Sequence, residues 1–310
     1  MSLYPLLFQP IVKPKVWGAE TWALSGYGED QSVVSNGFLE GNLLSEVLEI
    51  YMDELVGEHV FRRFGNTFPL LFKFIDAQDD LSIQVHPDDA QAAPLGMSGK
   101  AEMWYVTGAT SEASLVMGFS QDTSEDEVRR CLDDDSIMDV LQVVPVRKGD
   151  VAYIPAGTVH ALRRGTQVAE IQQTSDLTFR LYDYHRPGMD GKLRPLHINE
   201  SMAVLNFGRL VQPLVGYEPL TDKPVALVKD PHFVTSLLRL DRPVSRDYAA
   251  LDSFVACMCT EGRVAVRCMD SDVQEVVVSE GQTVLIPAAL PGITLCPLTG
   301  SAVMLEVTVP

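Results

Sequence analysis

Short runs in which apolar and polar residues alternate dominate this chain, and Gly, Pro or Asp stands near the ends of most of them. Alternation with a period of two is typical of half-buried β-strands, and these punctuating residues mark turns. Many short strands separated by turns favour a β-barrel or a β-sandwich over alternating βα units. The runs that predict strands most clearly are residues 67–77, 103–109, 113–119, 150–157, 168–173 and 178–184.

Helical patterns are rarer. The best candidate spans residues 123–142, because Thr123 or Ser124 can cap a helix there and acidic residues fill its first turn. The acidic run at 133–135 is a point at which this helix can divide in two. Residues 198–207 predict a second short helix.

The segment Leu81–Asp89, LSIQVHPDD, has an unusual polar face. Its apolar side chains alternate with Ser82, Gln84 and His86, and Pro87 then ends the run because it lacks a backbone donor. If this polar face points into a barrel, the three polar groups line the interior, where an unpaired polar group is costly. The segment therefore predicts a partner inside the barrel that satisfies them.

An internal repeat indicates two barrels. The stretch GDVAYIPAGTVHAL begins at Gly149 and the stretch GQTVLIPAALPGITL begins at Gly281, 132 residues later. Each has a glycine, an apolar strand pattern and an Ile-Pro-Ala turn, and the spacing is too long for a solenoid repeat. Where the first copy has His160, the second has Gly292. We therefore expect two copies of a small β-barrel, with a polar site only in the first.

Composition narrows the class of protein. The chain has 310 residues, of which 46% are hydrophobic and 21% charged, as in globular proteins of one large domain or two ordinary ones. It has no run of 18 apolar residues and no basic leader ahead of its first apolar run, so we expect neither a membrane span nor a secretory signal. Five cysteines do not suggest a disulfide framework, and Cys257 and Cys259 are expected in the core. A cytoplasmic location follows.

The formal net charge of −18 excludes two classes of partner. Nucleic acid and anionic membranes both require a basic surface, so we expect neither. A phosphorylated substrate would require local Lys or Arg side chains to overcome the repelling background.

Two other segments offer partners for the polar face of residues 81–89. GKAEMWYV places Glu102 at the start of a strand, and IPAGTVHAL places His160 after a tight turn. With Gln84 and His86, these residues form a set of nitrogen and oxygen ligands that suits zinc and that iron, manganese and cobalt also accept. Each residue alone is more often structural, and only the group supports a metal site. The remaining histidines lack a comparable setting: His59, His185, His197 and His232.

Four segments in the same order resemble the class I mannose-6-phosphate isomerases, which are zinc enzymes of the cupin fold: LSIQVHPDD, GKAEMWYV, YIPAGTVHAL and EIQQTSDLTFRLYD. The N-terminal PLLFQPIVKPKVWGAETWAL is similar to that family's opening segment. The similarity covers most of residues 5–186 and continues weakly beyond them. It implies an all-β fold of two cupin-type (jelly-roll) barrels with a few short helices, the second barrel being degenerate. Residues 1–215 would form the catalytic metal-binding domain, and residues 216–310 a cupin-like domain without the metal site.

The resemblance also implies a ligand set. The amide and imidazole of the family's Q-x-H motif, the acidic residue of its K-x-E segment and the histidine after its P-A-G turn bind one Zn²⁺ per chain. In this sequence they match Gln84, His86, Glu102 and His160.

Other positions match the family's substrate-handling residues. Arg180 corresponds to its active-site arginine, and Ser82 and Lys100 to residues that touch the sugar phosphate. From chemistry alone, Lys100 can supply positive charge or, if it is desolvated and loses its proton, act as a general base. One departure concerns Gly99, because long members of the family have a histidine there. The large helical insertion of the long forms is also missing, so the chain resembles the short bacterial type.

The implied activity is metal-dependent interconversion of mannose 6-phosphate and fructose 6-phosphate through an enediol, with a phosphorylated hexose as ligand and a monomer or homodimer as the working form. Two alternatives keep the metal. One is a non-catalytic sugar-binding or regulatory cupin, which the retention of Lys100 and Arg180 disfavours. The other is an iron site with two histidines and one glutamate as a facial triad, which Gln84 on the ligand face disfavours.

Overall fold

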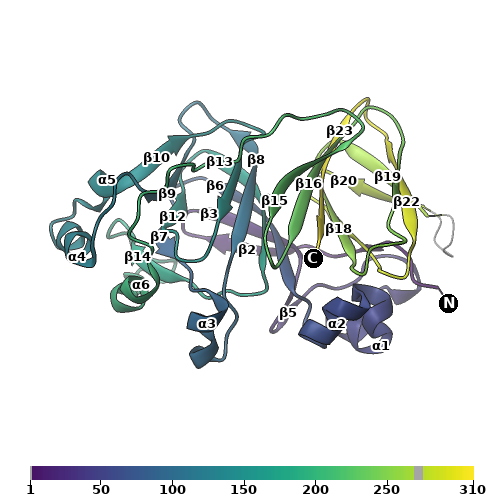
Figure 1. Cartoon of the computed structure of the whole chain (residues 1–310), viewed down its shortest axis with the longest axis horizontal. Coiled ribbons are helices and arrows are strands. Elements are labelled where there is room, and N and C mark those ends of the chain that lie inside the picture. The colour runs from purple at the N-terminus through teal and green to yellow at the C-terminus, as the bar shows by residue number, and fades with distance from the viewer. Residues whose placement is uncertain (1, 269–274) are drawn as a thin grey trace. The chain divides into compact units, whose positions relative to one another are not determined.

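The computed structural model describes residues 2–268 and 275–310 (Figure 1). Strands predominate and the helices are short, which confirms the predicted all-β class. In the described residues, no helix is both long and apolar enough to cross a membrane.

Eight consecutive strands, β6 to β13, form what we call the first barrel. One of its sheets has the order β11-β8-β13-β6 and is extended by β3 and β2, while the other has the order β10-β9-β12-β7 and is extended by β14. The pairs β9–β10, β8–β11, β7–β12, β9–β12, β8–β13 and β7–β14 are antiparallel. The bounds are β2 Ile11–Lys15, β3 Gly18–Leu24, β6 Leu70–Ala77, β7 Ile83–Val85, β8 Glu102–Ala109, β9 Ser114–Phe119, β10 Leu141–Pro145, β11 Val151–Ile154, β12 His160–Leu162, β13 Thr166–Gln173 and β14 Phe179–Tyr182.

Strands β16 to β23 form the second barrel. One sheet has the order β21-β18-β23-β16, extended by β1 and β15, and the other has the order β17-β22-β19-β20. A separate two-stranded ribbon joins β4 Gly26–Tyr27 to β5 Asp30–Gln31. The remaining bounds are β1 Leu6–Leu7, β15 Pro224–Lys229, β16 Val234–Leu240, β17 Val244–Asp247, β18 Val255–Glu261, β19 Arg263–Arg267, β20 Glu275–Ser279, β21 Thr283–Ile286, β22 Gly292–Pro297 and β23 Ala302–Thr308.

The two barrels have the same strand order. Counting from the first strand of each, one sheet is 1-8-3-6 and the other 2-7-4-5, which is the arrangement of a jelly roll. The sequence repeat falls at equivalent places, because β11 begins two residues after Gly149 and β21 two residues after Gly281. The next strands begin at His160 and Gly292. The predicted duplication is therefore confirmed.

In the described residues, the α-helices fall in four places along the chain. The predicted helix at 123–142 is capped by Ser124, whose hydroxyl accepts a 3.3 Å hydrogen bond from Glu127 N. It divides at the acidic run into α4 and α5, as expected. The last two residues of the predicted range begin strand β10 instead of continuing the helix. The predicted helix at 198–207 is also present. The helical bounds are α1 Leu44–Val56, α2 Glu58–Phe64, α3 Asp89–Ala92, α4 Glu125–Asp133, α5 Ile137–Val140 and α6 Ile198–Val204, with 3₁₀ turns at Gly37–Leu39 and Ala93–Leu95.

Helices α1 and α2 were not predicted. The residue before α1 is Leu43, which has no side-chain oxygen to cap the helix, so the usual start signal is absent. Instead the Glu46 carboxylate accepts a 2.8 Å hydrogen bond from the Leu43 backbone N–H. Gly57, with φ of 96°, then separates the two helices.

The chain forms two compact units. One contains residues 1–11, 21–73 and 216–310, and the other contains residues 12–20 and 74–215. Most of the N-terminal segment, residues 21–73, belongs to the same unit as the second barrel.

Alternating burial positions the polar face of strand β7. Ile83 and Val85 lie in an apolar cluster with residues of helices α4, α5 and α6, so their face is covered by these helices. The intervening polar side chains therefore lie on the opposite face of the strand. Cys257 and Cys259 are fully buried in the apolar cluster of the second barrel, as expected.

Candidate metal centre

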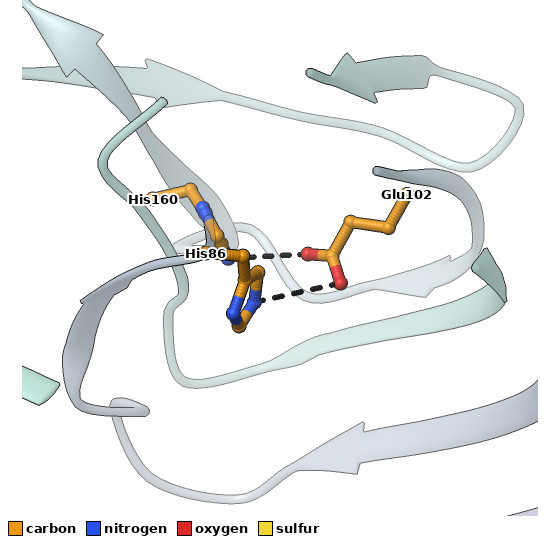
Figure 2. A group of neighbouring side chains, drawn as sticks. All are labelled: His86, Glu102 and His160. Atoms are coloured by element: carbon orange, nitrogen blue, oxygen red, sulfur yellow. Dashed lines mark ion pairs between the residues drawn. The ribbon is translucent and has the colours of Figure 1, made fainter. Parts of the chain in front are cut away.

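Three buried side chains from separate strands converge in the first barrel (Figure 2). His86 directly follows β7, Glu102 begins β8 and His160 begins β12. Their nearest ligand atoms all lie within 4.8 Å of one another. In the described part of the chain, this is the only group of three or more His, Cys, Asp or Glu side chains with that spacing.

Backbone contacts hold the converging segments together. Pro87 ends β7 and its carbonyl accepts a 3.0 Å hydrogen bond from Lys100 N, which brings the segment before Glu102 beside His86. The His86 carbonyl accepts a 2.8 Å bond from Gly157 N in the turn before His160. These bonds fix the three strand ends against one another.

Each histidine presents the same nitrogen to the centre. Nδ1 of His86 lies 2.8 Å from the Leu177 carbonyl, and Nδ1 of His160 lies 2.8 Å from the Thr158 carbonyl. Because a carbonyl only accepts, both Nδ1 atoms carry the proton and both Nε2 atoms have a lone pair in place of a proton. Metal-binding histidines are commonly oriented in this way.

The two unprotonated Nε2 atoms face the Glu102 carboxylate. Nε2 of His160 is 3.1 Å from Oε1, and Nε2 of His86 is 3.7 Å from Oε2. Nε2 of His86 and both carboxylate oxygens are buried without a hydrogen bond of good geometry. Such a group of acceptors is costly unless a cation lies among them. Since two ligands at about 2 Å from one tetrahedral zinc ion are roughly 3.3 Å apart, these donors fit a divalent metal.

Charge in the centre favours neutral histidine and ionised glutamate. Burial lowers the pKa of His86 well below its ordinary value, and the Lys100 ammonium adds to this effect. Burial acts to raise the pKa of Glu102, but opposing charges, of which Lys100 is the largest, hold it well below its usual range. These are the protonation states that metal ligands require.

Lys100 itself is buried, with Nζ 3.2 Å from Glu102 Oε2. A solvated loop lysine is therefore the wrong description of this residue. Ser82 is also buried, on the polar face of the same strand segment as Gln84.

Gln84 lies at the edge of the group. It is the register partner of His160, and its amide nitrogen is 3.3 Å from His160 Nε2. A half-turn of the planar amide exchanges its nitrogen and oxygen, which would direct the acceptor to the same space.

Close packing explains why position 99 is a glycine. A Cβ atom at this position would lie 2.5 Å from both the Asp88 carbonyl carbon and the Asp89 nitrogen. The Asp89 carboxylate accepts a 2.8 Å hydrogen bond from Gly99 N, so the two segments are in direct contact. The chain therefore has no room for a side chain at position 99.

Arg180 lies outside the three-residue group but in the same row of the sheet. Its register partner on β7 is Gln84, which in turn faces His160 on β12. Its Nη1 donates a 2.9 Å hydrogen bond to the Pro195 carbonyl. Burial and then the nearby Arg194 charge lower its pKa.

Sequence reasoning named Asp183 as a possible partner of Arg180 but missed Arg186, Arg194 and His197. The Asp183 carboxylate accepts hydrogen bonds from Arg186 and Arg194, and His197 Nδ1 accepts from the Arg180 backbone N–H. The only sequence signal was the high density of basic residues between 180 and 197.

Comparisons with known proteins identify the family. A family model described as phosphomannose isomerase type I, catalytic domain, matches residues 8–106. The mannose-6-phosphate isomerase ManA of Bacillus subtilis (strain 168) is 38% identical over 224 residues, covering 66% of this chain and 69% of that protein. The mannose-6-phosphate isomerase of Streptococcus mutans serotype c (strain ATCC 700610 / UA159) is 34% identical over 285 residues, covering 84% and 87%.

Solved structures agree. A crystal structure of the mannose 6-phosphate isomerase from Bacillus subtilis matches with a TM-score of 0.84 and 26% identity, covering 98% of this chain and 99% of that one. A putative mannosephosphate isomerase from Archaeoglobus fulgidus shares the fold, with a TM-score of 0.78 and 20% identity over 99% of this chain and 98% of that one. The resemblance found in the sequence is thus confirmed, and this chain belongs to the type I mannose-6-phosphate isomerase family.

Proposed function

We propose that this chain is a metal-dependent aldose–ketose isomerase that interconverts mannose 6-phosphate and fructose 6-phosphate through an enediol. The observation that carries the proposal is the convergence of two histidine lone pairs on a buried carboxylate, in a chain of this family. Such a group has little structural use without a cation, because its acceptors are then unsatisfied.

The proposed ligands are Gln84, His86, Glu102 and His160, and the proposed ion is one Zn²⁺ per chain. Zinc suits a tetrahedral set of nitrogen and oxygen donors with a single carboxylate, which leaves net positive charge at the site. A bound zinc ion would act as a Lewis acid that stabilises negative charge developing on the sugar oxygens.

The chain's own side chains supply the remaining chemistry. Lys100 is buried 3.2 Å from Glu102 Oε2, so its ammonium stands beside the proposed metal site, where charge acts strongly because water is excluded. We propose that Lys100 contacts the sugar with Ser82 and carries a proton during the transfer between C1 and C2. Arg180 offers a planar fork of donors to an oxyanion or phosphate.

Domain organisation and setting follow from the same proposal. We assign the chemistry to residues 1–215 and a cupin-like domain without a metal site to residues 216–310. We also propose a cytoplasmic location, since all five cysteines are buried free thiols, as is usual in reducing compartments. The working form would be a monomer or a homodimer.

The test combines two measurements on the purified full-length chain. Metal analysis of aerobically purified protein is expected to find one zinc per chain, and a coupled assay for fructose 6-phosphate is expected to show turnover of mannose 6-phosphate. Metal without turnover would favour a sugar-binding cupin instead, and iron in place of zinc would favour an oxygen-using facial triad. Arg180→Ala is expected to keep the metal and lose turnover, and full activity in that variant would refute its role.

A further inference from the structure

A cluster of three arginines surrounds the end of strand β14. Asp183 Oδ2 accepts a 2.7 Å hydrogen bond from Arg194 Nε, and its Oδ1 accepts a 2.5 Å bond from Arg194 Nη2. Arg186 Nη2 reaches the same Oδ1 at 3.0 Å, and Arg186 Nη1 lies 3.2 Å from Asp79 Oδ2. The third guanidinium, that of Arg180, makes no ion pair among the described residues, so the cluster has one positive charge more than its two carboxylates neutralise.

Arg180 and the segment containing Arg194 run side by side. Arg180 Nη1 donates to the carbonyl of Pro195, the next residue after Arg194, and the Arg180 carbonyl accepts a 2.8 Å bond from His197 N. Nε of Arg180 is buried without a hydrogen-bond partner. Asp183 engages Nε and Nη2 of Arg194 and leaves its Nη1 available.

The distance between the arginine cluster and the metal centre suits a hexose 6-phosphate that spans the two. Arg180, Gln84 and His160 occupy one row across three adjacent strands, so the backbones of Arg180 and His160 are about 10 Å apart. A hexose 6-phosphate has its reacting carbons at one end and its phosphate at the other, and this row presents a proposed metal at one end and unpaired positive charge at the other.

The charges of the arginine cluster favour binding of an anion beside Arg180. Burial and the Arg194 charge both lower the pKa of Arg180, which means that its positive charge is destabilised where it stands. The buried Asp183 carboxylate holds Arg194 near Arg180 despite their repulsion. A chain with a net charge of −18 that keeps such a cluster has a local means of attracting a phosphate.

We propose that Arg194, held in place by Asp183, is a substrate-binding residue that grips the phosphate group of the sugar together with Arg180. The inference rests on the proposed function for the identity of the sugar, but the phosphate contact can be tested without turnover. Two guanidinium forks suit the three oxygens of a phosphate dianion.

The experiment uses the full-length metal-loaded chain and its Arg194→Ala and Arg194→Gln variants. Inorganic phosphate is titrated calorimetrically into each protein, and kcat and KM are measured for mannose 6-phosphate. Losing one charge-assisted contact is expected to weaken phosphate binding by about tenfold or more and to raise KM by a similar factor, with a smaller change in kcat. Arg194→Lys, which keeps the charge but not the fork, is expected to recover part of the loss.

Three controls separate this role from others. Arg147→Ala removes an equal charge from a side chain that is 91% exposed, and it is expected to bind phosphate as the unmodified chain does. His160→Ala is titrated in parallel, because phosphate that binds to the arginines remains bound when the metal is lost. Arg194→Gln keeps a donor for Asp183, so it remains informative if Arg194→Ala fails to fold.

Phosphate affinity within twofold of the unmodified chain in a folded Arg194 variant would overturn the proposal, as would an equal loss in Arg147→Ala. The proposed function can fail separately. If the unmodified chain binds phosphate through Arg194 yet does not convert mannose 6-phosphate, the phosphate contact stands and the isomerase assignment falls.

Discussion

The two barrels are built to one plan but have different interiors. Both consist of eight strands in the same order. The first barrel encloses the converging side chains of His86, Glu102 and His160, whereas the second encloses a cluster of mainly aliphatic, cysteine and methionine side chains. The strand order therefore does not depend on the polar site, and the site is an addition to a fold that stands without it.

Strand registers show which residues replaced the proposed ligands. Glu102 on β8 pairs with Ile154 of the repeated Ile-Pro-Ala turn, and in the second barrel Val255 on β18 pairs with the equivalent Ile286. A buried carboxylate has thus been exchanged for a buried aliphatic group at one position of the plan.

The position of His160 differs between the two barrels in the same way. His160 pairs with Gln84 in the first barrel, and Gly292 pairs with Asp247 in the second. A Cβ atom on Gly292 would lie 2.7 Å from the Arg246 carbonyl oxygen, so the second barrel has closed the space that a ligand would occupy. At these two positions the second barrel therefore has neither the donor atoms of the first nor the space for them.

The largest effect is expected when one proposed ligand is removed. His160→Ala takes away a nitrogen that nothing nearby replaces, so the chain is expected to lose its zinc and at least about 10³-fold in kcat/KM. Metal analysis and the coupled assay check this. His59→Ala, on helix α2, is the control and should keep both. A full equivalent of zinc in His160→Ala would contradict the proposed location of the metal site in the first barrel, because it would mean that a site exists elsewhere.

Exchanging the equivalent residue in the second barrel is expected to cost stability. Val255→Glu buries a second carboxylate in this barrel, where Arg246 is already paired with Glu306, and this should lower the free energy of unfolding by about 3–5 kcal/mol. Urea unfolding measures the loss. Val12→Glu is the matched control, because that valine is largely exposed and the same change there should cost less than about 0.5 kcal/mol. Equal midpoints for the two variants would contradict the contrast drawn between the interiors.

Some of this site was predictable from sequence because it depends on local pattern. Strict alternation around Gln84 and His86 puts both on one face of a strand, and the internal repeat locates His160 at the start of another. Strand order then brings these faces together. The same local logic gave the capped helix at Ser124 and its division at the acidic run.

The rest depends on contacts that no pattern encodes. Arg194 reaches Asp183 through an irregular loop that begins with two consecutive left-handed residues, Tyr184 and His185. Non-glycine residues seldom adopt that conformation, so nothing in their identity announces the turn. Helix α1 was missed because Leu43, the residue before it, lacks a capping side chain. The reason for Gly99 appears only when Asp88 packs against it.

Removing the metal should affect the first barrel alone. At a free zinc concentration 100 times the dissociation constant, binding stabilises the folded chain by about 2.7 kcal/mol, so a chelator is expected to lower the melting temperature and zinc to restore it. Hydrogen exchange should rise in β7, β8 and β12, which hold or flank the proposed ligands, and stay unchanged in the equivalent β17, β18 and β22. Equal increases in both sets would show that the metal supports the second barrel too.

The smallest effect concerns the polar group that the second barrel has kept. Glu306 is buried there, accepts two hydrogen bonds from Arg246 at 2.7 and 2.9 Å, and accepts a third from the Tyr248 hydroxyl at 2.7 Å. Its counterpart by register in the first barrel is Glu170, which accepts the indole N–H of Trp104 at 3.1 Å. A buried carboxylate that accepts a side-chain hydrogen bond is therefore common to both barrels at this position.

In the first barrel, Trp104 also packs edge-on against His160, with ring centroids 5.4 Å apart. Burial raises the pKa of Tyr248, so its hydroxyl keeps its proton and remains a donor. Tyr248→Phe removes one donor while Arg246 still holds the carboxylate, and should lower the free energy of unfolding by about 1–2 kcal/mol with zinc content and turnover unchanged. Denaturant unfolding with parallel assays tests this. A loss of turnover without a loss of stability would mean that the second barrel contributes to the chemistry, and its apolar interior would then have to be read as more than support.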